Sequence, residues 1–177
     1  MGKQYASLTQ KDIDFIKNQK LFYLASCSGK EVNLSPKGYD SIRVIDSRTL
    51  LYLDLPGSGN RTYRDAMAGG EFTLVFNAFE GSAKILRIFA KAEPIERNDP
   101  RFEGYLSHFG VNSIYIRRLF IFDIDAVETS CGMAVPYMAF EKERKSLKNW
   151  VKDMAKEGRL EAYMQKHHEP PSLKDLE

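Results

Sequence analysis

Two stretches carry most of the information in this chain: NLSPKG at residues 33–38 and DLPGSGNRT at residues 54–62. Each comes at the end of a short apolar run that is typical of a β-strand. Together they hold hydroxyl side chains, three flexible glycines, the lysine Lys37 and the arginine Arg61. Glycine lets backbone N–H groups approach an anion, while lysine supplies a point charge and arginine a forked donor. We therefore predict a phosphate-binding site where short strands end.

The glycine pattern excludes two common nucleotide sites. A Walker loop needs Gly-Lys-Ser/Thr after its glycines, and no such sequence follows Gly57 or Gly59. The dinucleotide fingerprint needs a third glycine, whereas this loop stops at one pair. These differences favour a phosphorylated ligand that is smaller than a dinucleotide.

The composition is that of an ordinary globular domain. The chain has 177 residues, of which 43% are hydrophobic and 28% charged, enough for one domain with a sizeable core. A net charge of +2 is too small to indicate a nucleic-acid partner, and no apolar run approaches the ~20 residues that cross a bilayer. Cys27 and Cys131 form neither a disulfide framework nor a zinc spacing, and the start of the chain lacks the apolar core of a signal peptide. We expect a cytoplasmic protein with no metal site and no membrane partner.

Alternating apolar residues predict six or seven short strands joined by tight turns. Consecutive strands with such short connections pair in an antiparallel sense, which favours a β-barrel with helices at its periphery. The strands are predicted at 21–26, 32–37, 42–45, 49–53, 72–79, 85–95 and 114–127.

Helices are predicted from their caps and from helical spacing. Thr9 and Asp12 have the spacing of a capping box, and Asp99-Pro100 is typical of a helix start that would continue to about His108. A short helix is expected at 61–67, ended by the glycines that follow. After residue 136 the apolar spacing becomes helical around 147–154 and 160–164. We therefore expect a single domain over residues 1–177, with a helical extension at about 137–177.

Four motifs resemble those of the pyridoxamine 5′-phosphate oxidase-like FMN-binding proteins. SPKG at 35–38, LPGSGNR at 55–61 and LRIFAKA at 86–92 stand in the order and spacing of that family. CGMAVP at 131–136 resembles the segment that follows the last strand in one of its branches. The resemblance implies an α+β fold, an antiparallel split β-barrel, that forms homodimers and holds FMN in a groove at the subunit interface.

The resemblance also implies roles for individual residues. Lys37 matches the lysine that reaches the flavin or its phosphate. Arg61, with Thr62 beside it, matches the basic and hydroxyl pair that grips the phosphate after the glycine loop. Arg87 falls on the strand that lines the other wall of the groove. A lysine or arginine near the reduced flavin would stabilise its negative charge, and Lys37 is our choice for this role.

Three further residues are expected at the cofactor site from their own chemistry. Ser58 belongs to the phosphate grip, because hydroxyl, glycine and guanidinium coincide there at a helix start. The hydroxyl of Ser35 is directed by the proline that follows it. Asn60 is kept in the site, although a helix cap is the interpretation that we favour for it.

The leading hypothesis is an FMN-dependent oxidoreductase that passes electrons from a reduced nicotinamide to a small acceptor. The flavin would carry the chemistry, so no catalytic side chain is assigned. Asn33 stands where the true oxidases have an arginine, and their arginine-rich C-terminal segment has no counterpart, so pyridoxamine phosphate is not the expected substrate. One alternative is a flavin-binding protein without turnover. Another is a haem-handling relative, which would need a histidine such as His108.

Overall fold

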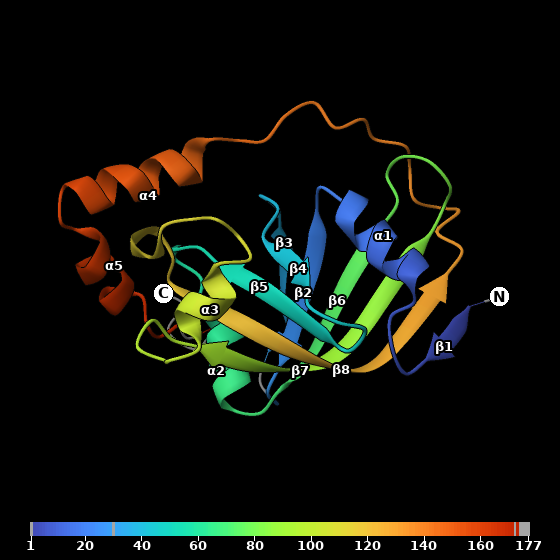
Figure 1. The fold of residues 1–177 in the computed structure, drawn as a ribbon, viewed down its shortest axis with the longest axis horizontal. Helices are drawn as coiled ribbons and strands as arrows, with labels where there is room; N and C mark the ends of the chain where they lie inside the picture. Colours follow the sequence, from blue (N-terminus) through green and yellow to red (C-terminus); the bar gives the residue numbers. More distant parts are fainter. Residues whose placement is uncertain (1, 30, 172, 174–177) are drawn as a thin grey trace.

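The computed structural model describes residues 2–29, 31–171 and 173 of the chain. An antiparallel sheet forms its centre, with strand order β3-β2-β6-β7-β8-β5-β4 and with β1 alongside β8 (Figure 1). Among the described residues the edge strands β3 and β4 do not pair with each other, so the curled sheet stays open between them. This confirms the predicted α+β split barrel. The strands are β1 (Lys3–Tyr5), β2 (Phe22–Cys27), β3 (Asn33–Lys37), β4 (Ile42–Val44), β5 (Thr49–Asp54), β6 (Glu71–Asn77), β7 (Ile85–Ile95) and β8 (Arg118–Ser130).

The centre of the sheet is buried on both faces. Strand β5 shows how, because Leu50 and Tyr52 lie in the core inside the curled sheet, whereas Leu51 and Leu53 pack against the helix α3 (Phe102–Leu106) on the opposite face. When the side chains on both faces of a strand are buried, its sequence is a continuous apolar run, and the sequence of β5 is such a run. The inner core also contains Leu24, Phe72, Leu74, Phe76, Leu86, Ile88, Phe120 and Phe122.

Helix α1 (Gln10–Asn18) begins as predicted. The Thr9 hydroxyl accepts a hydrogen bond from the backbone N–H of Asp12, and the Asp12 carboxylate accepts one from the backbone N–H of Thr9. The same carboxylate accepts from the Tyr5 hydroxyl at 2.7 Å and pairs with Lys84 at 2.9 Å. Burial alone would raise the pKa of Asp12, but the hydrogen bonds from Thr9, Lys84 and Tyr5 outweigh it and lower that pKa. The cap therefore also ties β1 and α1 to the turn before β7.

Helix α2 (Arg61–Met67) has the predicted bounds, and Gly69 ends it with a φ of 66°. Gly70 is needed for a different reason, since a Cβ there would lie 2.5 Å from the carbonyl oxygen of Cys27 at the end of β2. This close approach packs the C-terminal end of α2 against the end of β2.

Residues 96–117 fold differently from the prediction. The helix expected from Asp99 to His108 is shorter, because Asp99 closes a turn by accepting hydrogen bonds from the N–H groups of Arg101 and Phe102. The strand expected from residue 114 begins only at Arg118. It is preceded by a 3-10 helix, η1 (Ser113–Tyr115), in which the side chain of Asn112 accepts from the backbone N–H of Ile114. The strand β1 was not predicted, since three residues carry too little periodicity.

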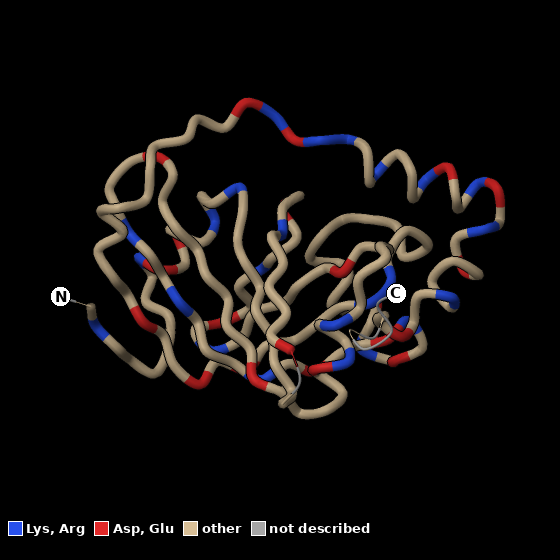
Figure 2. Tube along the Cα trace, turned by 180° about the vertical axis from the view of Figure 1, so that it is seen from behind, with Lys and Arg blue, Asp and Glu red and all other residues tan. Residues whose placement is uncertain are grey.

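After β8 the chain forms an arm and two helices. Residues 131–145 cross the molecule without helix or strand, and α4 (Ser146–Lys156) and α5 (Leu160–Lys166) follow (Figure 1). Both helices occur where helical spacing predicted them, and they share an apolar cluster with Tyr115 of η1. Residues 131–140 of the arm carry no charged side chain, whereas charges of both signs are interspersed over residues 141–145 and α4 (Figure 2). The parts of the predicted extension at residues 172 and 174–177 lie outside the described residues. None of the helices in the described ranges is long and apolar enough to cross a membrane.

Candidate functional site

A cavity of about 270 Å³ lies where several elements end. The end of β3, the end of β5, the glycine loop 55–59 and the first turn of α2 form its walls, and Leu147 of α4 closes one side. Five of the seven residues that the sequence predicted for the cofactor site line it: Ser35, Lys37, Asn60, Arg61 and Thr62.

Arg117 holds the glycine loop in place. Its guanidinium is buried and donates to the Asp54 carboxylate at 2.8 and 3.3 Å, to the carbonyl of Gly57 at 3.1 Å and to that of Gly59 at 2.9 Å. A buried carboxylate needs such a partner, and arginine offers enough donors to satisfy the loop carbonyls as well. The loop is therefore tied to the end of β5, and Arg117 itself also lines the cavity.

Lys37 brings a cation to the cavity. Its ammonium lies 5.6 Å from the centre of the Tyr52 ring, which is buried between Phe22 and Phe120. Burial lowers the pKa of Lys37, Asp54 acts in the opposite direction by its charge, and Arg117 lowers the pKa further. Burial also raises the pKa of the Tyr52 hydroxyl well above its ordinary value, and the charge of Asp54 adds to this effect. Tyr52 is thus mainly a packing residue, and it also forms part of the cavity wall.

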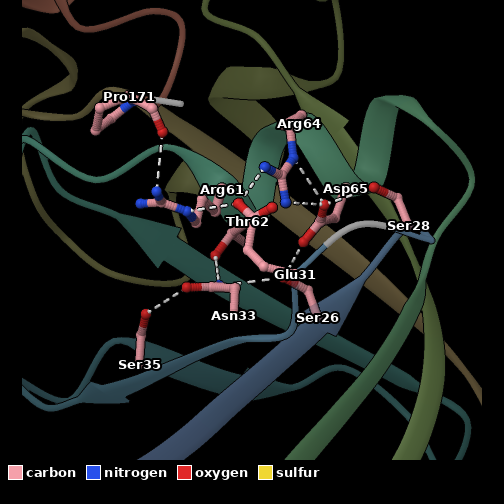
Figure 3. A network of polar contacts seen from close by, with 10 residues as sticks. All are labelled: Ser26, Ser28, Glu31, Asn33, Ser35, Arg61, Thr62, Arg64, Asp65 and Pro171. Carbon is pink, nitrogen blue, oxygen red and sulfur yellow. Dashed lines mark hydrogen bonds and ion pairs between the residues drawn. The ribbon is translucent and has the colours of Figure 1, made fainter. Parts of the chain in front are cut away.

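Hydroxyl and amide groups form a chain of hydrogen bonds next to Arg61 and Thr62, the residues predicted to bind the phosphate (Figure 3). Asn33 donates to the Thr62 hydroxyl at 3.3 Å and to the Ser26 hydroxyl at 3.1 Å, and it accepts from Ser35 at 3.3 Å. Ser26 in turn donates to the buried Asp65 at 2.7 Å. Asn33 therefore positions two predicted ligands, Ser35 and Thr62.

Arg61 already has an anionic partner. Its Nε donates to the Glu31 carboxylate at 2.8 Å, and its Nη2 donates to the carbonyl of Pro171 at 2.9 Å (Figure 3). Arg64 donates to the same Glu31 oxygen at 2.5 Å. Hydrogen bonds from Arg64 and Arg61 lower the pKa of Glu31 to about 2. A phosphate that uses Arg61 must therefore share it with, or take it from, a carboxylate that is charged at neutral pH.

The structure corrects the interpretation of Asn60 as a side-chain cap. Asn60 stands at the N-cap position of α2, but its side chain makes no capping hydrogen bond. The amide oxygen accepts from Arg118 at 2.7 Å, and the amide nitrogen donates to the carbonyl of His168. Arg118 also stacks over Tyr63 at 3.8 Å and pairs with Glu96 at 2.7 Å. These long-range partners outcompete the local cap, and they attach the C-terminal segment to α2.

Two predicted residues lie apart from this cavity. Ser58 is exposed at the tip of the glycine loop and is not among the lining residues. Arg87 lies on β7, where it pairs with Glu128 at 3.3 Å and donates to Ser130 at 3.0 Å. Within the chain described, neither side chain faces the groups that line the cavity.

Sequence reasoning missed the two residues that organise the site, Arg117 and Glu31. A signal existed for the first, because Asp54 ends an apolar strand and Arg117-Arg118 begins another, and buried opposite charges require each other. Glu31 carried no signal, since it lies in the connection between β2 and β3 and meets Arg61 only through the fold.

The donor set of the cavity is suited to an anion next to a flat apolar group. Lys37, Arg61, Ser35 and Thr62 offer cationic and hydroxyl donors, while Tyr52, Leu53 and Leu55 supply apolar surface. In the described parts of the chain no group of three His, Cys, Asp or Glu side chains could hold a metal ion.

One curated relative matches a large part of the sequence, whereas no protein-family model matches it. Over 139 residues the chain is 36% identical to the pyridoxamine 5′-phosphate oxidase family protein ustO of Aspergillus flavus. The alignment covers 76% of this chain and 56% of that protein. The chain thus spans little more than half the length of its relative.

Solved structures share the fold. A provisionally assigned pyridoxamine 5′-phosphate oxidase of Lactobacillus delbrueckii is 25% identical, with a TM-score of 0.56 over 68% of this chain and 93% of that one. HupZ of Group A Streptococcus is 21% identical, with a TM-score of 0.56 over 68% and 91% of the two chains. The FAD-binding protein of Mycobacterium smegmatis reaches a TM-score of 0.50 at 10% identity, over 71% of this chain and 97% of that one. Sequence and fold together place this chain in the pyridoxamine 5′-phosphate oxidase-like family of split barrels.

Proposed function

We propose that this chain binds FMN in the cavity and acts as an oxidoreductase, taking electrons from a reduced nicotinamide and passing them to a small acceptor. The observation that carries the proposal is the meeting of Ser35 and Lys37 from β3 with Arg61 and Thr62 from α2 on the walls of one cavity. These segments are far apart in the chain, and the sequence independently predicts each of them for the cofactor site. Membership of the family and the name of the M. smegmatis neighbour support a flavin as the class of cofactor.

The residues present fit FMN by their chemistry. Arg61 and Thr62 would hold the phosphate, Ser35 would donate to a polar edge of the ligand, and Lys37 would face negative charge on the ring. When bound, the flavin supplies the hydride and electron transfer, and the protein binds it, orients it and sets the charge around it. Arg117 would contribute by satisfying the loop carbonyls of Gly57 and Gly59, since it donates to both of them.

The test is an absorbance spectrum of the purified protein after incubation with FMN and gel filtration. We expect a retained two-band flavin spectrum, and we expect addition of reduced nicotinamide to bleach it. A protein that retains no flavin would contradict the proposal as a whole. A retained flavin that no reduced nicotinamide bleaches would identify the non-catalytic alternative. A single intense haem band after incubation with haem would favour the haem-handling alternative. His108, the histidine considered for that role, is exposed and does not line this cavity.

We further propose that the protein is a homodimer in which the partner completes the flavin groove. The cavity of about 270 Å³ lies below the ~300–1,000 Å³ typical of small-molecule sites, which supports a half-site. Val32 and Leu34 also leave apolar side chains exposed along the edge of the sheet. Light scattering should give about twice the chain mass of 20.3 kDa. A monomer that persists at micromolar concentration while binding FMN would exclude the shared groove.

The reducing cytoplasm is the location that we propose. Both cysteines, Cys27 and Cys131, are free. Free thiols, one of them exposed, persist in a reducing compartment and become oxidised outside it, which supports this choice.

A further inference from the structure

A second cavity of about 360 Å³ adjoins the first one. It lies between the turn 39–43, the loop 109–116 and helix α4. Leu53, Leu55 and Tyr39 line both cavities, so a single wall separates them. Helix α4 covers both, since Leu147 lines the first cavity and Lys148, Val151 and Lys152 line the second.

The lining of this second cavity is apolar and partly aromatic inside. Phe109, Tyr115, Ile116 and Val151 provide this surface. Ile116 and Val151 are buried, and Tyr115 belongs to the cluster that joins η1 to α4. Aromatic and aliphatic walls of this kind accept a flat apolar body, because they bury its surface and can stack on its faces.

Five charged side chains line the second cavity, and in the described residues four of them form two ion pairs while one lysine has no ion-pair partner. Arg43 is paired with Asp40 at 2.8 Å and stacks on Phe109 at 4.7 Å. Lys148 is paired with Glu143 at 3.3 Å. Lys152 lines the same cavity, and within the described residues it has no ion pair. The unbalanced charge at this rim therefore favours a ligand with one negative group.

The wall between the cavities is held in an unusual backbone conformation. Tyr39 and Asp40 have φ values of 67° and 55°, the left-handed region that non-glycine residues rarely adopt. Asp40 is held there by its bonds to Arg43, and Tyr39 lies under the Lys148 ammonium at 4.4 Å. Two consecutive residues in this region carry a conformational cost, and such costs cluster at ligand sites. Here the strained turn presents the Tyr39 side chain to both cavities.

We propose that the second cavity is the substrate site and that it takes a planar, largely apolar molecule with a single carboxylate. The flat body would lie against Phe109 and Tyr115, and the carboxylate would meet Lys152. Such a ligand would lie directly across the Tyr39 wall from the cavity assigned to FMN. The role of this cavity as a substrate site rests on the proposed flavin function. Binding of the ligand does not depend on that function and can be tested without flavin.

The first experiment measures binding of indole-3-carboxylate to the full chain without FMN by isothermal titration calorimetry. Indole-3-carboxamide is the uncharged control ligand. Lys152→Gln removes the rim charge, and Lys156→Gln is a matched control on the same helix, because Lys156 is exposed and lines neither cavity. We expect the carboxylate to bind more tightly than the carboxamide, and Lys152→Gln to weaken the carboxylate about two- to fivefold, as for an exposed ion pair. Equal binding of both ligands, equal effects of both variants, or no binding would overturn the proposal.

The second experiment uses FMN-loaded protein and follows the flavin absorbance during the same titration. A ligand in the adjoining cavity should shift the flavin bands, with a midpoint that moves in Lys152→Gln by the factor found in calorimetry. Probe binding without a spectral shift would overturn the substrate assignment. If the probe binds but the protein takes up no FMN, the flavin function fails while the carboxylate site stands, so the two failures are distinguishable.

Discussion

Replacement of Arg117 by methionine is expected to lower the free energy of unfolding by about 3–5 kcal/mol, the cost of breaking a buried ion pair from one side. The side chains of Arg117 and Asp54 are 8% and 7% exposed, so the change leaves a buried carboxylate with only the longer contact to Arg118 at 3.9 Å. It also strips the donors from the carbonyls of Gly57 and Gly59. Urea unfolding at pH 7 measures the loss, and the midpoint should fall with an unchanged slope.

Arg87→Met is the matched control for this prediction. The pair of Arg87 and Glu128 is 35% and 32% exposed, so its loss should cost no more than about 1 kcal/mol. The double variant Asp54→Leu/Arg117→Met removes both buried charges and should recover part of the stability. If Arg117→Met were no more damaging than Arg87→Met, the loop would not depend on the buried pair.

Removal of the Arg61 guanidinium is expected to weaken FMN about 10- to 150-fold, which corresponds to the ~1.5–3 kcal/mol of a charge-assisted hydrogen bond. Arg61→Ala should leave riboflavin binding nearly unchanged, because riboflavin lacks the phosphate. Quenching of flavin fluorescence measures both affinities in the same buffer. Equal losses for FMN and riboflavin would show that Arg61 does not contact the phosphate.

The pairing of Arg61 with Glu31 adds a second arm to this experiment. Glu31→Gln removes the carboxylate that competes for Arg61 and should therefore tighten FMN while leaving riboflavin unaffected. Because the pKa of Glu31 is held at about 2, the carboxylate stays charged above pH 4, and acidification to that pH does not free Arg61. An FMN affinity that falls in Glu31→Gln would mean that Glu31 orients Arg61 for the phosphate instead of competing with it.

Local hydrogen bonding explains which features could be predicted from the sequence. The capping box of Thr9 and Asp12 and the glycine that ends α2 involve residues within one helical turn, so their spacing alone specifies them. Alternation of apolar residues placed β7 at its observed bounds, since a strand with one buried and one more exposed face shows that regular pattern. Where local polar side chains offered another set of bonds, as Asp99 and Asn112 do, the predicted helix and strand were cut short.

For the site, the sequence by itself determined the chemistry of the donors, and the tertiary structure decided which of them share a cavity. Ser35, Lys37, Arg61 and Thr62 could be chosen by residue type, because phosphate needs hydroxyls and cations at flexible turns. The partners of these residues could not be chosen, since Arg117 reaches Asp54 only because the ends of β5 and β8 are paired at Asp54 and Arg118. The pairing of β7 with β8 likewise leaves Arg87 opposite Glu128, outside the cavity lining. Register within a sheet is a property of the whole set of strands, so no local pattern in the chain reveals it.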